Sequence, residues 1–158
     1  MINIKKHSGI YTLSIEQKLP LLIEKAWDFF SSPHNLAAIT PKHMGFHITS
    51  DTTEKMYPGQ IISYNVSPLF GIKMNWVTEI THMEHHQYFV DEQRFGPYLM
   101  WHHEHHFEPL ADGVLMKDKV SYKLPVGVLG RLFHPIIVEP QLKAIFEYRY
   151  ETLDKFFK

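Results

Sequence analysis

Six short segments in which apolar and polar residues alternate follow one another between residues 45 and 123. They cover about residues 45–52, 59–67, 71–82, 87–95, 98–108 and 113–123. Alternation of this kind is typical of β-strands that bury one face. Turn-forming residues separate the segments, namely Pro58-Gly59, Phe70-Gly71, Gly96-Pro97 and Asp112-Gly113. Because parallel strands need long crossover connections, these short turns predict an antiparallel meander.

The segments before the meander predict a strand followed by a helix. Residues 10–19 alternate between apolar and polar side chains, which indicates a strand. Residues 22–30 carry apolar side chains at helical spacing and are followed by Ser31-Ser32-Pro33, so a short helix is expected to end there. Residues 34–39 can form one more helical turn before Pro41.

The last part of the chain changes to a helical period. From about Val128, apolar side chains recur every three or four residues, which predicts a long amphipathic C-terminal helix. Pro135 and Pro140 lie within this pattern and predict a break or kink near them. The elements together predict an α+β architecture in which the terminal helix covers one face of the sheet. A twisted sheet wrapped around a long helix leaves a space that can hold a ligand.

Composition excludes several classes of function. A length of 158 residues suits one domain covering residues 1–158. Aromatic residues make up 14% of the chain, more than a minimal aliphatic core needs, so some can line a cavity. With 16 basic and 17 acidic residues, and no basic cluster interleaved with aromatic residues, we expect no nucleic-acid partner.

Cysteine and long apolar runs are both missing from the sequence. The lack of cysteine excludes disulfides, thiolate nucleophiles and cysteine-ligated metals. No apolar segment follows Lys5 and Lys6 as in a signal peptide, and no run approaches the roughly 20 residues of a membrane span. We therefore expect a cytoplasmic protein without stable membrane insertion. A homodimer remains open.

The segment Trp101-His-His-Glu-His-His-Phe107 concentrates the question of function. Alternation places Trp101, His103, His105 and Phe107 on one face of a strand, and His102, Glu104 and His106 on the other. The face with the two large aromatic residues is expected to be buried. A buried imidazole needs a hydrogen-bond partner, a metal ion or a ligand.

The next strand carries a carboxylate on its apolar face. Asp118 shares that face with Met116, Val120 and Tyr122. If the intervening turn is centred on Ala111-Asp112, His105 lies opposite Asp118 and Glu104 lies opposite Lys119. If it is centred on Asp112-Gly113, Phe107 lies opposite Asp118, and His105 is a diagonal neighbour. Either register brings a histidine close to Asp118.

Two interpretations of this pair remain open. In one, the carboxylate orients an imidazole whose other nitrogen is free to exchange a proton with a ligand, which makes His103, His105 and Asp118 the catalytic candidates. In the other, the residues form a buried polar network that satisfies itself and fixes the strands.

A metal site is a further hypothesis for the same residues. The spacing His103-x-His105 lets two imidazoles on one strand face reach a single ion, with Asp118 or Asp91 as a third ligand. Such a pair is common by chance in a histidine-rich stretch, and no second ligand motif such as H-E-x-x-H occurs. We therefore expect neither a metal nor a cofactor.

The facing of the preceding strand stays open. Phe89, Asp91 and Gln93 share one face of it, but the Gly96-Pro97 connection permits strand pairing of either parity. The aromatic residues that could line a cavity are Tyr64, Trp76, Tyr98, Trp101, Phe107 and Tyr122.

Several motifs together resemble a known superfamily. They are Trp27-Asp-Phe-Phe-Ser-Ser-Pro-His-Asn-Leu36, Ile39-Thr40-Pro41, Pro58-Gly59, Phe70-Gly71-Ile72 with Trp76, Phe89-Val90-Asp91-Glu92-Gln93, Gly96-Pro97-Tyr98, the segment 101–108, the segment 116–122 and the segment 125–131. In combination they resemble the START-like, or Bet v 1-like, helix-grip superfamily (SRPBCC). They are most similar to a bacterial ligand-binding branch whose members are sometimes labelled polyketide cyclase/dehydrase or cell-division inhibitor.

The resemblance implies a fold and a cavity. The fold is of the β-α-α-β6-α order, with roughly seven antiparallel strands curved around a long C-terminal helix. Members of the superfamily hold lipids, sterols, hormones, quinones or polyketides, and some are aromatic cyclases. Our leading hypothesis is a non-enzymatic protein that binds a small, largely hydrophobic or aromatic ligand, such as a lipid, quinone or polyketide-like molecule, between sheet and helix.

Two alternatives accompany this hypothesis. One is a cyclase or dehydratase type of enzyme that transfers protons through the His-Asp pair. The other is an interaction domain with little cavity. The residues expected to contact the ligand are Trp76, Asp91, Gln93, Tyr98, Trp101, His103, His105, Phe107, Met116, Asp118 and Tyr122.

Overall fold

The computed structural model describes residues 1–67, 71–125 and 127–158, with the backbone alone for residues 128, 129 and 131. Phe70, which belongs to one turn signal and one motif, lies outside the described residues, as does Val126. The side chains of Val128 and Leu129, where the helical period was expected to begin, are likewise not described.

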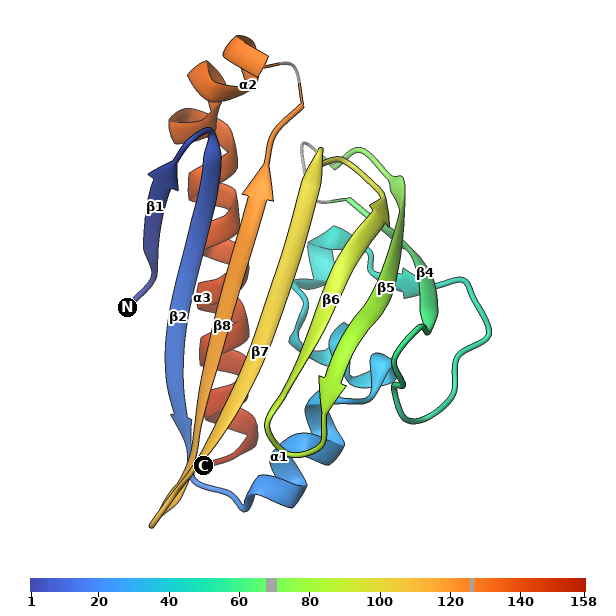
Figure 1. Ribbon diagram of the computed structural model, residues 1–158, viewed down its shortest axis with the longest axis vertical. Coiled ribbons are helices and arrows are strands. Elements are labelled where there is room, and N and C mark those ends of the chain that lie inside the picture. Colours follow the sequence, from blue (N-terminus) through green and yellow to red (C-terminus); the bar gives the residue numbers. More distant parts are fainter. Residues whose placement is uncertain (68–70, 126) are drawn as a thin grey trace.

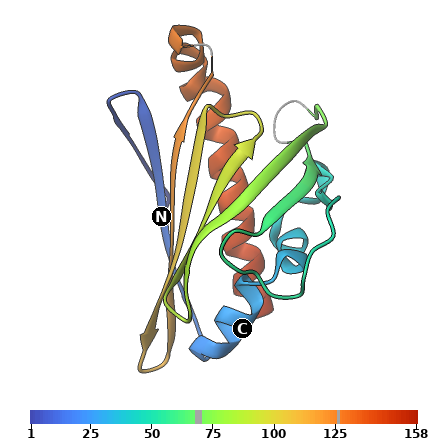
Figure 2. The ribbon, with the colours of Figure 1, turned by 45° about the vertical axis from the view of Figure 1, so that its right-hand side comes forward.

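An antiparallel sheet of eight strands forms the larger layer, in the order β1-β2-β8-β7-β6-β5-β4-β3. It curves strongly, so that one face is concave (Figures 1 and 2). The strands are β1 Asn3–His7, β2 Ile10–Leu19, β3 His47–Ile48, β4 Ile61–Val66, β5 Met74–Glu84, β6 Tyr88–Phe95, β7 Met100–Leu110 and β8 Gly113–Lys123.

Helices cover the concave face. The long helix α3, Glu139–Phe156, runs along the sheet. Shorter helices lie beside it and complete the cover of the concave face (Figure 2). These are α1 Ile23–Phe30 and the 3₁₀ helices η1 Pro33–Ile39 and η2 Lys42–Met44. The helix α2 Gly127–Phe133 and the π-helical turn η3 His134–Val138 lead into α3, and α2 lies at the top of Figure 1. The predicted α+β helix-grip fold, with a curved antiparallel sheet around a C-terminal helix, is confirmed.

The apolar core consists of two clusters along the sheet. The first packs Leu142 and Phe146 of α3 against residues such as Leu13 and Tyr122. The second packs α1 against the other end of the same strands and includes Leu19, Ala26, Trp27, Phe30, Phe107 and Met116. Fully burying a large apolar side chain contributes about 1.5–3 kcal/mol, so these clusters are the main source of stability. His103, His105 and Asp118 lie between the clusters along β7 and β8.

The β7–β8 hairpin adopts the first of the two predicted registers. Leu110 pairs with Gly113, so Ala111 and Asp112 form the turn, and His105 lies opposite Asp118. The predicted pair on the outer face also forms, with Lys119 Nζ donating to Glu104 Oε1 over 2.8 Å.

The N-terminal strand β1 was not predicted. It contains one partly buried apolar residue, Ile4, in an otherwise exposed segment at the sheet edge, so it shows no apolar alternation. The signal that could have found it is Ser8-Gly9, because both residues have positive φ (50° and 80°), as a two-residue hairpin turn requires.

The strand expected over residues 45–52 is largely wrong. Met44 ends η2, and Gly45 follows it in the left-handed conformation. The strand β3 contains only His47 and Ile48, because the backbone N–H groups of Thr49 and Ser50 both bond to the carbonyl of Ser63 and the ladder ends there. The strand expected from residue 71 begins at Met74, as β5.

The expected break in the C-terminal helix is confirmed. The π-helical turn η3 contains Pro135, and Pro140 is the second residue of α3, directly after this turn. His134 anchors this junction to the sheet, because its ring stacks on Tyr11 at 3.6 Å and its Nε2 accepts from the Tyr122 hydroxyl at 2.7 Å. Among the described residues, no helix has the length and apolar character needed to cross a membrane.

We predict that Gly113→Ala weakens the hairpin that carries the two histidines. A Cβ at Gly113 would lie 2.3 Å from the Leu19 carbonyl oxygen, and the φ of +149° is strained for any other residue. The free energy of unfolding should fall by about 2–4 kcal/mol in urea titrations. Gly45→Asn is the control, because Asn tolerates φ +57° and nothing lies near its Cβ, so the loss should stay below about 1 kcal/mol. Equal losses for the two variants would contradict the prediction.

We also predict that His134 titrates below the ordinary pKa of about 6.5. Burial lowers the pKa of His134, and the charge of Lys6 adds to this, whereas Glu139 opposes it. Because folding favours the neutral ring, its contribution to stability is complete above about pH 6.5 and is lost as the pH falls below that value. An NMR titration of the His134 imidazole measures the pH of the midpoint. A midpoint at or above about pH 6.5 would contradict the prediction.

Candidate functional site

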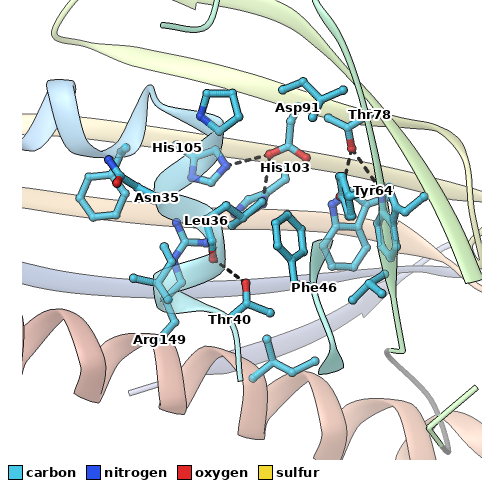
Figure 3. Close-up of a pocket in the computed structure, with 18 of the residues that line it drawn as sticks. Asn35, Leu36, Thr40, Phe46, Tyr64, Thr78, Asp91, His103, His105 and Arg149 are labelled. Carbon is cyan, nitrogen blue, oxygen red and sulfur yellow. Dashed lines mark hydrogen bonds and ion pairs between the residues drawn. The ribbon is translucent and has the colours of Figure 1, made fainter. Parts of the chain in front are cut away.

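A cavity of about 170 Å³ lies between the concave face and the helices (Figure 3). An apolar cavity of roughly 150 Å³ in another protein holds benzene, so this volume suits a small aromatic molecule. Strands β4 to β7, helices α1 and α3 and the 3₁₀ segments all contribute to its wall. Most wall residues are apolar, including Leu36, Ile62, Ile80, Leu142 and Phe146.

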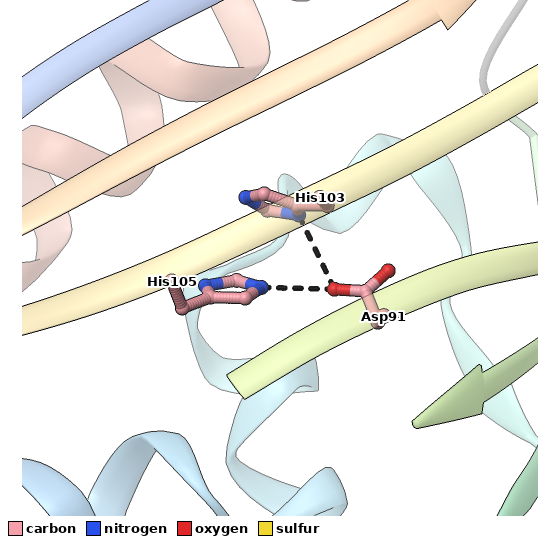
Figure 4. Close-up of side chains that lie close together, drawn as sticks. All are labelled: Asp91, His103 and His105. Carbon is pink, nitrogen blue, oxygen red and sulfur yellow. Dashed lines mark hydrogen bonds and ion pairs between the residues drawn. The ribbon is translucent and has the colours of Figure 1, made fainter. Parts of the chain in front are cut away.

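Three ionisable side chains meet at one place in this wall. Asp91 projects from β6 toward two imidazoles of β7, those of His103 and His105 (Figure 4). Asp91 Oδ2 accepts from His105 Nε2 at 2.8 Å and lies 3.4 Å from His103 Nδ1. The two imidazole rings lie 3.7 Å apart. All three residues line the cavity, and 18% of the Asp91 side chain is exposed.

Asp118 lies behind the imidazoles, on the side away from the cavity. His103 Nε2 donates to its Oδ1 at 3.1 Å. His105 Nδ1 lies 2.9 Å from the same oxygen, but it has no hydrogen bond of acceptable geometry among the described residues. Arg149 of α3 places its Nη2 4.0 Å from that oxygen and its guanidinium 5.8 Å from the centre of the Phe30 ring. Each carboxylate therefore faces both imidazoles.

The strand register explains this arrangement. Asp91 lies directly opposite His103 in the β6–β7 ladder, and Asp118 lies directly opposite His105 in the β7–β8 ladder. Residues opposite one another in an antiparallel pair have their Cβ atoms about 4.5–5.5 Å apart, and diagonal neighbours remain within reach of long side chains. The two aspartates thus flank the imidazole pair from the two neighbouring strands.

The ionisation of these residues is set by burial and by their mutual charges. Burial alone would raise the pKa of Asp91 and of Asp118, but the histidines, and Arg149 for Asp118, outweigh it and lower both pKa values well below the usual range. Burial opposes the charged form of His103, but the two aspartates outweigh it and raise the pKa of His103. The carboxylates therefore stay charged next to a ring that favours its protonated form.

A second polar group lies in the strand wall of the cavity. Thr78 Oγ1 accepts from Trp76 Nε1 at 3.2 Å and bonds with the Tyr64 hydroxyl at 3.3 Å (Figure 3). Burial raises the pKa of Tyr64, and the charge of Asp91 adds to it, so the hydroxyl stays protonated. The strand side of the cavity wall therefore has a second polar point beside the cluster of Asp91, His103 and His105.

The structure brings part of the predicted ligand-binding set into the cavity wall. Asp91, whose facing was open, points into the cavity. It does so because it pairs with His103 in the β6–β7 ladder and therefore lies on the same face of the sheet. The predicted residues that line the cavity are Trp76, Asp91, Tyr98, Trp101, His103 and His105. Tyr64, expected only as one of the possible lining aromatics, lines it as well.

The other predicted ligand-binding residues do not line this cavity. Gln93 shares the strand face of Asp91, but its side-chain Nε2 donates to the backbone carbonyl of Tyr98 at 2.7 Å and closes the turn between β6 and β7. Phe107 packs against Trp27 and Phe30 of α1, and Met116 belongs to the same apolar cluster. Tyr122 is bonded to His134. Asp118 lies behind the histidines and borders only a space of about 10 Å³, the size of one water.

The helical part of the wall was missed, and Arg149 with it. In α3 the buried residues are Leu142, Phe146, Arg149 and Leu153, at spacings of four, three and four. A charged residue in a series of otherwise apolar positions was the available signal, because burying an unpaired guanidinium is costly. Such a residue needs an acidic partner on the facing sheet, and Asp118 is that partner.

Comparison with known proteins places this geometry in a known fold. No family model and no curated protein matches the sequence. A protein from Mycobacterium smegmatis of solved structure is 12% identical, with a TM-score of 0.67 over 99% of this chain and 97% of its own. The major latex-like protein 151 from Panax ginseng is 10% identical, with a TM-score of 0.66 over 95% and 99% of the two chains.

The protein Ara h 8.0201 is 16% identical, with a TM-score of 0.59 over 93% of this chain and 99% of its own. Identities of this size show the fold and do not carry a function with them. The chain shares the helix-grip fold of these three proteins.

Proposed function

We propose that the protein binds a small, largely apolar or aromatic ligand in the cavity between its sheet and α3. One observation carries the proposal: an apolar cavity of about 170 Å³ has ionisable side chains gathered at one place in its wall. Ligand sites are typically apolar cavities with a few polar groups that fix the orientation of the ligand. The resemblance to a superfamily whose members hold lipids, quinones or polyketides supports the same conclusion.

The polar groups favour a ligand with one hydroxyl or carbonyl group. Asp91 is the member of the cluster with exposed surface, and it accepts hydrogen bonds only. Tyr64 stays protonated, so its hydroxyl can donate. A phenol-like group of the ligand could donate a hydrogen bond to Asp91, and a carbonyl group could accept one from Tyr64.

Proton transfer, the alternative function, has weaker support. That hypothesis requires one imidazole nitrogen held by a carboxylate and the other free for the ligand. His103 instead has Asp118 at Nε2 and Asp91 at Nδ1, and His105 has the same two aspartates at its two nitrogens. A proton could reach the ligand only through Asp91, which favours a binding role for the cluster.

We predict that Leu36→Trp weakens binding of 2-naphthol, an aromatic probe with one hydroxyl. Leu36 lines the cavity from η1, so the larger indole should occupy part of its volume and raise the Kd at least about tenfold. Isothermal titration calorimetry in the presence of a chelator measures the Kd. Ala37→Trp is the matched control, because the adjacent residue is exposed and does not line the cavity. A Kd that is unchanged by Leu36→Trp, or raised equally by both variants, would refute the proposal.

We predict that Asp118→Asn lowers stability but leaves the affinity for 2-naphthol within about threefold. The residue is 5% exposed and outside the cavity wall, and it holds two imidazoles and Arg149. Removing one partner of a buried charge pair costs about 3–5 kcal/mol, and the isosteric amide keeps part of the hydrogen bonding, so a loss of about 2 kcal/mol or more is expected in urea titrations.

The matched control for this variant is Glu104→Gln on the outer face of β7. Its partner Lys119 is 52% exposed, so the loss should stay below about 1 kcal/mol. If Asp118→Asn instead keeps its stability and loses affinity, Asp118 acts on the ligand, and the proton-transfer alternative gains the support that the binding proposal loses.

A further inference from the structure

We propose that Asp91, His103 and His105 bind one divalent transition-metal ion at the cavity wall. This goes beyond ligand binding and reverses the sequence-based expectation of no metal. That expectation rested on how common an H-x-H pair is by chance and on the lack of a second ligand motif, and the facing of Asp91 was open. The β6–β7 register now places its carboxylate against both imidazoles.

The donor atoms have a spacing suited to one ion. Asp91, His103 and His105 each offer one donor atom, and these three atoms lie within 4.8 Å of one another. The carboxylate oxygen is 2.8 Å from His105 Nε2 and 3.4 Å from His103 Nδ1. Ligands about 2.0–2.2 Å from an ion are separated by about 2.8–3.6 Å in tetrahedral or octahedral geometry. The two carboxylate–imidazole distances are already close to this range, and the donor atoms of the two imidazoles, at most 4.8 Å apart, would complete the site by turning toward the ion.

Asp118 has the position expected of an outer partner of metal-bound histidines. Histidines that ligate a metal usually donate their other ring N–H to a carboxylate, which fixes the tautomer and the ring orientation. Asp118 Oδ1 lies 3.1 Å from His103 Nε2 and 2.9 Å from His105 Nδ1. These are the two nitrogens that face away from Asp91. The unpartnered His105 Nδ1 would gain its bond if the ring turned toward the ion site.

The donor set favours a particular class of ion. Two imidazoles and one carboxylate suit zinc, iron(II) or cobalt(II), whereas magnesium and calcium prefer oxygen ligands alone. Three protein ligands leave at least one coordination position free, and all three residues border the cavity. A metal site with an open position of this kind can bind a ligand atom as well as hold the ion.

Charge indicates which ligand atom that would be. The carboxylates of Asp91 and Asp118 and the guanidinium of Arg149 sum to −1, and a divalent ion bound by neutral imidazoles brings the sum to +1. An anionic oxygen, such as a phenolate or carboxylate, would neutralise this charge in a mostly apolar cavity. This last step rests on the proposed ligand-binding function, whereas the metal site itself does not.

The opposite face of the same strand supplies the control. His102 and His106 are 33% and 39% exposed and pair with Glu92 and Glu104. These outer residues offer similar donor atoms, but they lie away from the cavity, and the carboxylate that they share, Glu104, also pairs with Lys119. Replacing both histidines tests whether any bound metal resides on the surface.

The experiment is a cobalt titration of the full chain expressed without a polyhistidine tag and stripped with a chelator. Visible absorption reports coordination of Co²⁺, and competition with Zn²⁺ gives the affinity for Zn²⁺. We expect one equivalent with a Kd below about 10 µM, a loss of at least about tenfold for Asp91→Asn, and a loss of about 10–100-fold for Asp118→Asn. His102→Ala/His106→Ala should change the Kd by less than about twofold.

A measurement on the wild-type protein keeps the test independent of variant folding. NMR of the imidazoles during Zn²⁺ addition should shift the signals of His103 and His105 at one equivalent, before those of His102 and His106. No binding below about 1 mM overturns the proposal. Metal binding that is unchanged in Asp91→Asn would also overturn it, and so would metal binding that is lost in His102→Ala/His106→Ala. Because the 2-naphthol titration is done with a chelator, a failed metal site leaves the ligand-binding result unaffected.

Discussion

The structure depends on the mutual neutralisation of ionisable groups that are buried between two apolar clusters. His103, His105 and Asp118 are 6%, 4% and 5% exposed, and Asp91 joins them from the neighbouring strand. An isolated charge in such surroundings would cost several kcal/mol or more, so none of these residues is tolerable alone. Each carboxylate faces two imidazoles, and Arg149 reaches the inner one from α3. The cluster therefore ties β6, β7, β8 and the terminal helix to one arrangement.

The cavity lies beside this cluster because the helices cover the sheet unevenly. At one end α1 packs Trp27 and Phe30 on the strands, and at the other His134 stacks on Tyr11. Between them the helix α3 and the 3₁₀ segments leave a space of about 170 Å³ over strands β4 to β7. Asp91 faces that space and Asp118 faces away from it, so two similar carboxylates have different surroundings. The first can meet a ligand or an ion, and the second can only position the histidines.

Much of the fold, and three of the five residues of the cluster, could be predicted from the sequence. Alternation determined the facing of His105 and Asp118, and the short hairpin allowed only two registers, both of which bring them together. Asp91 could not be placed, because the Gly96-Pro97 connection permits either parity. Arg149 was missed because its partner lies far away along the chain, on a different element. Cavity walls combine residues from strands and helices whose relative positions follow from packing, and local patterns do not contain that information.

A crystal structure of the protein with 2-naphthol tests the central claim most directly. We expect the naphthalene ring between β4–β7 and α3, with its hydroxyl within hydrogen-bonding distance of Asp91. The imidazoles of His103 and His105 should remain between the two aspartates. A cavity filled by side chains, or a ligand bound elsewhere while the cavity stays vacant, would contradict the proposed ligand site.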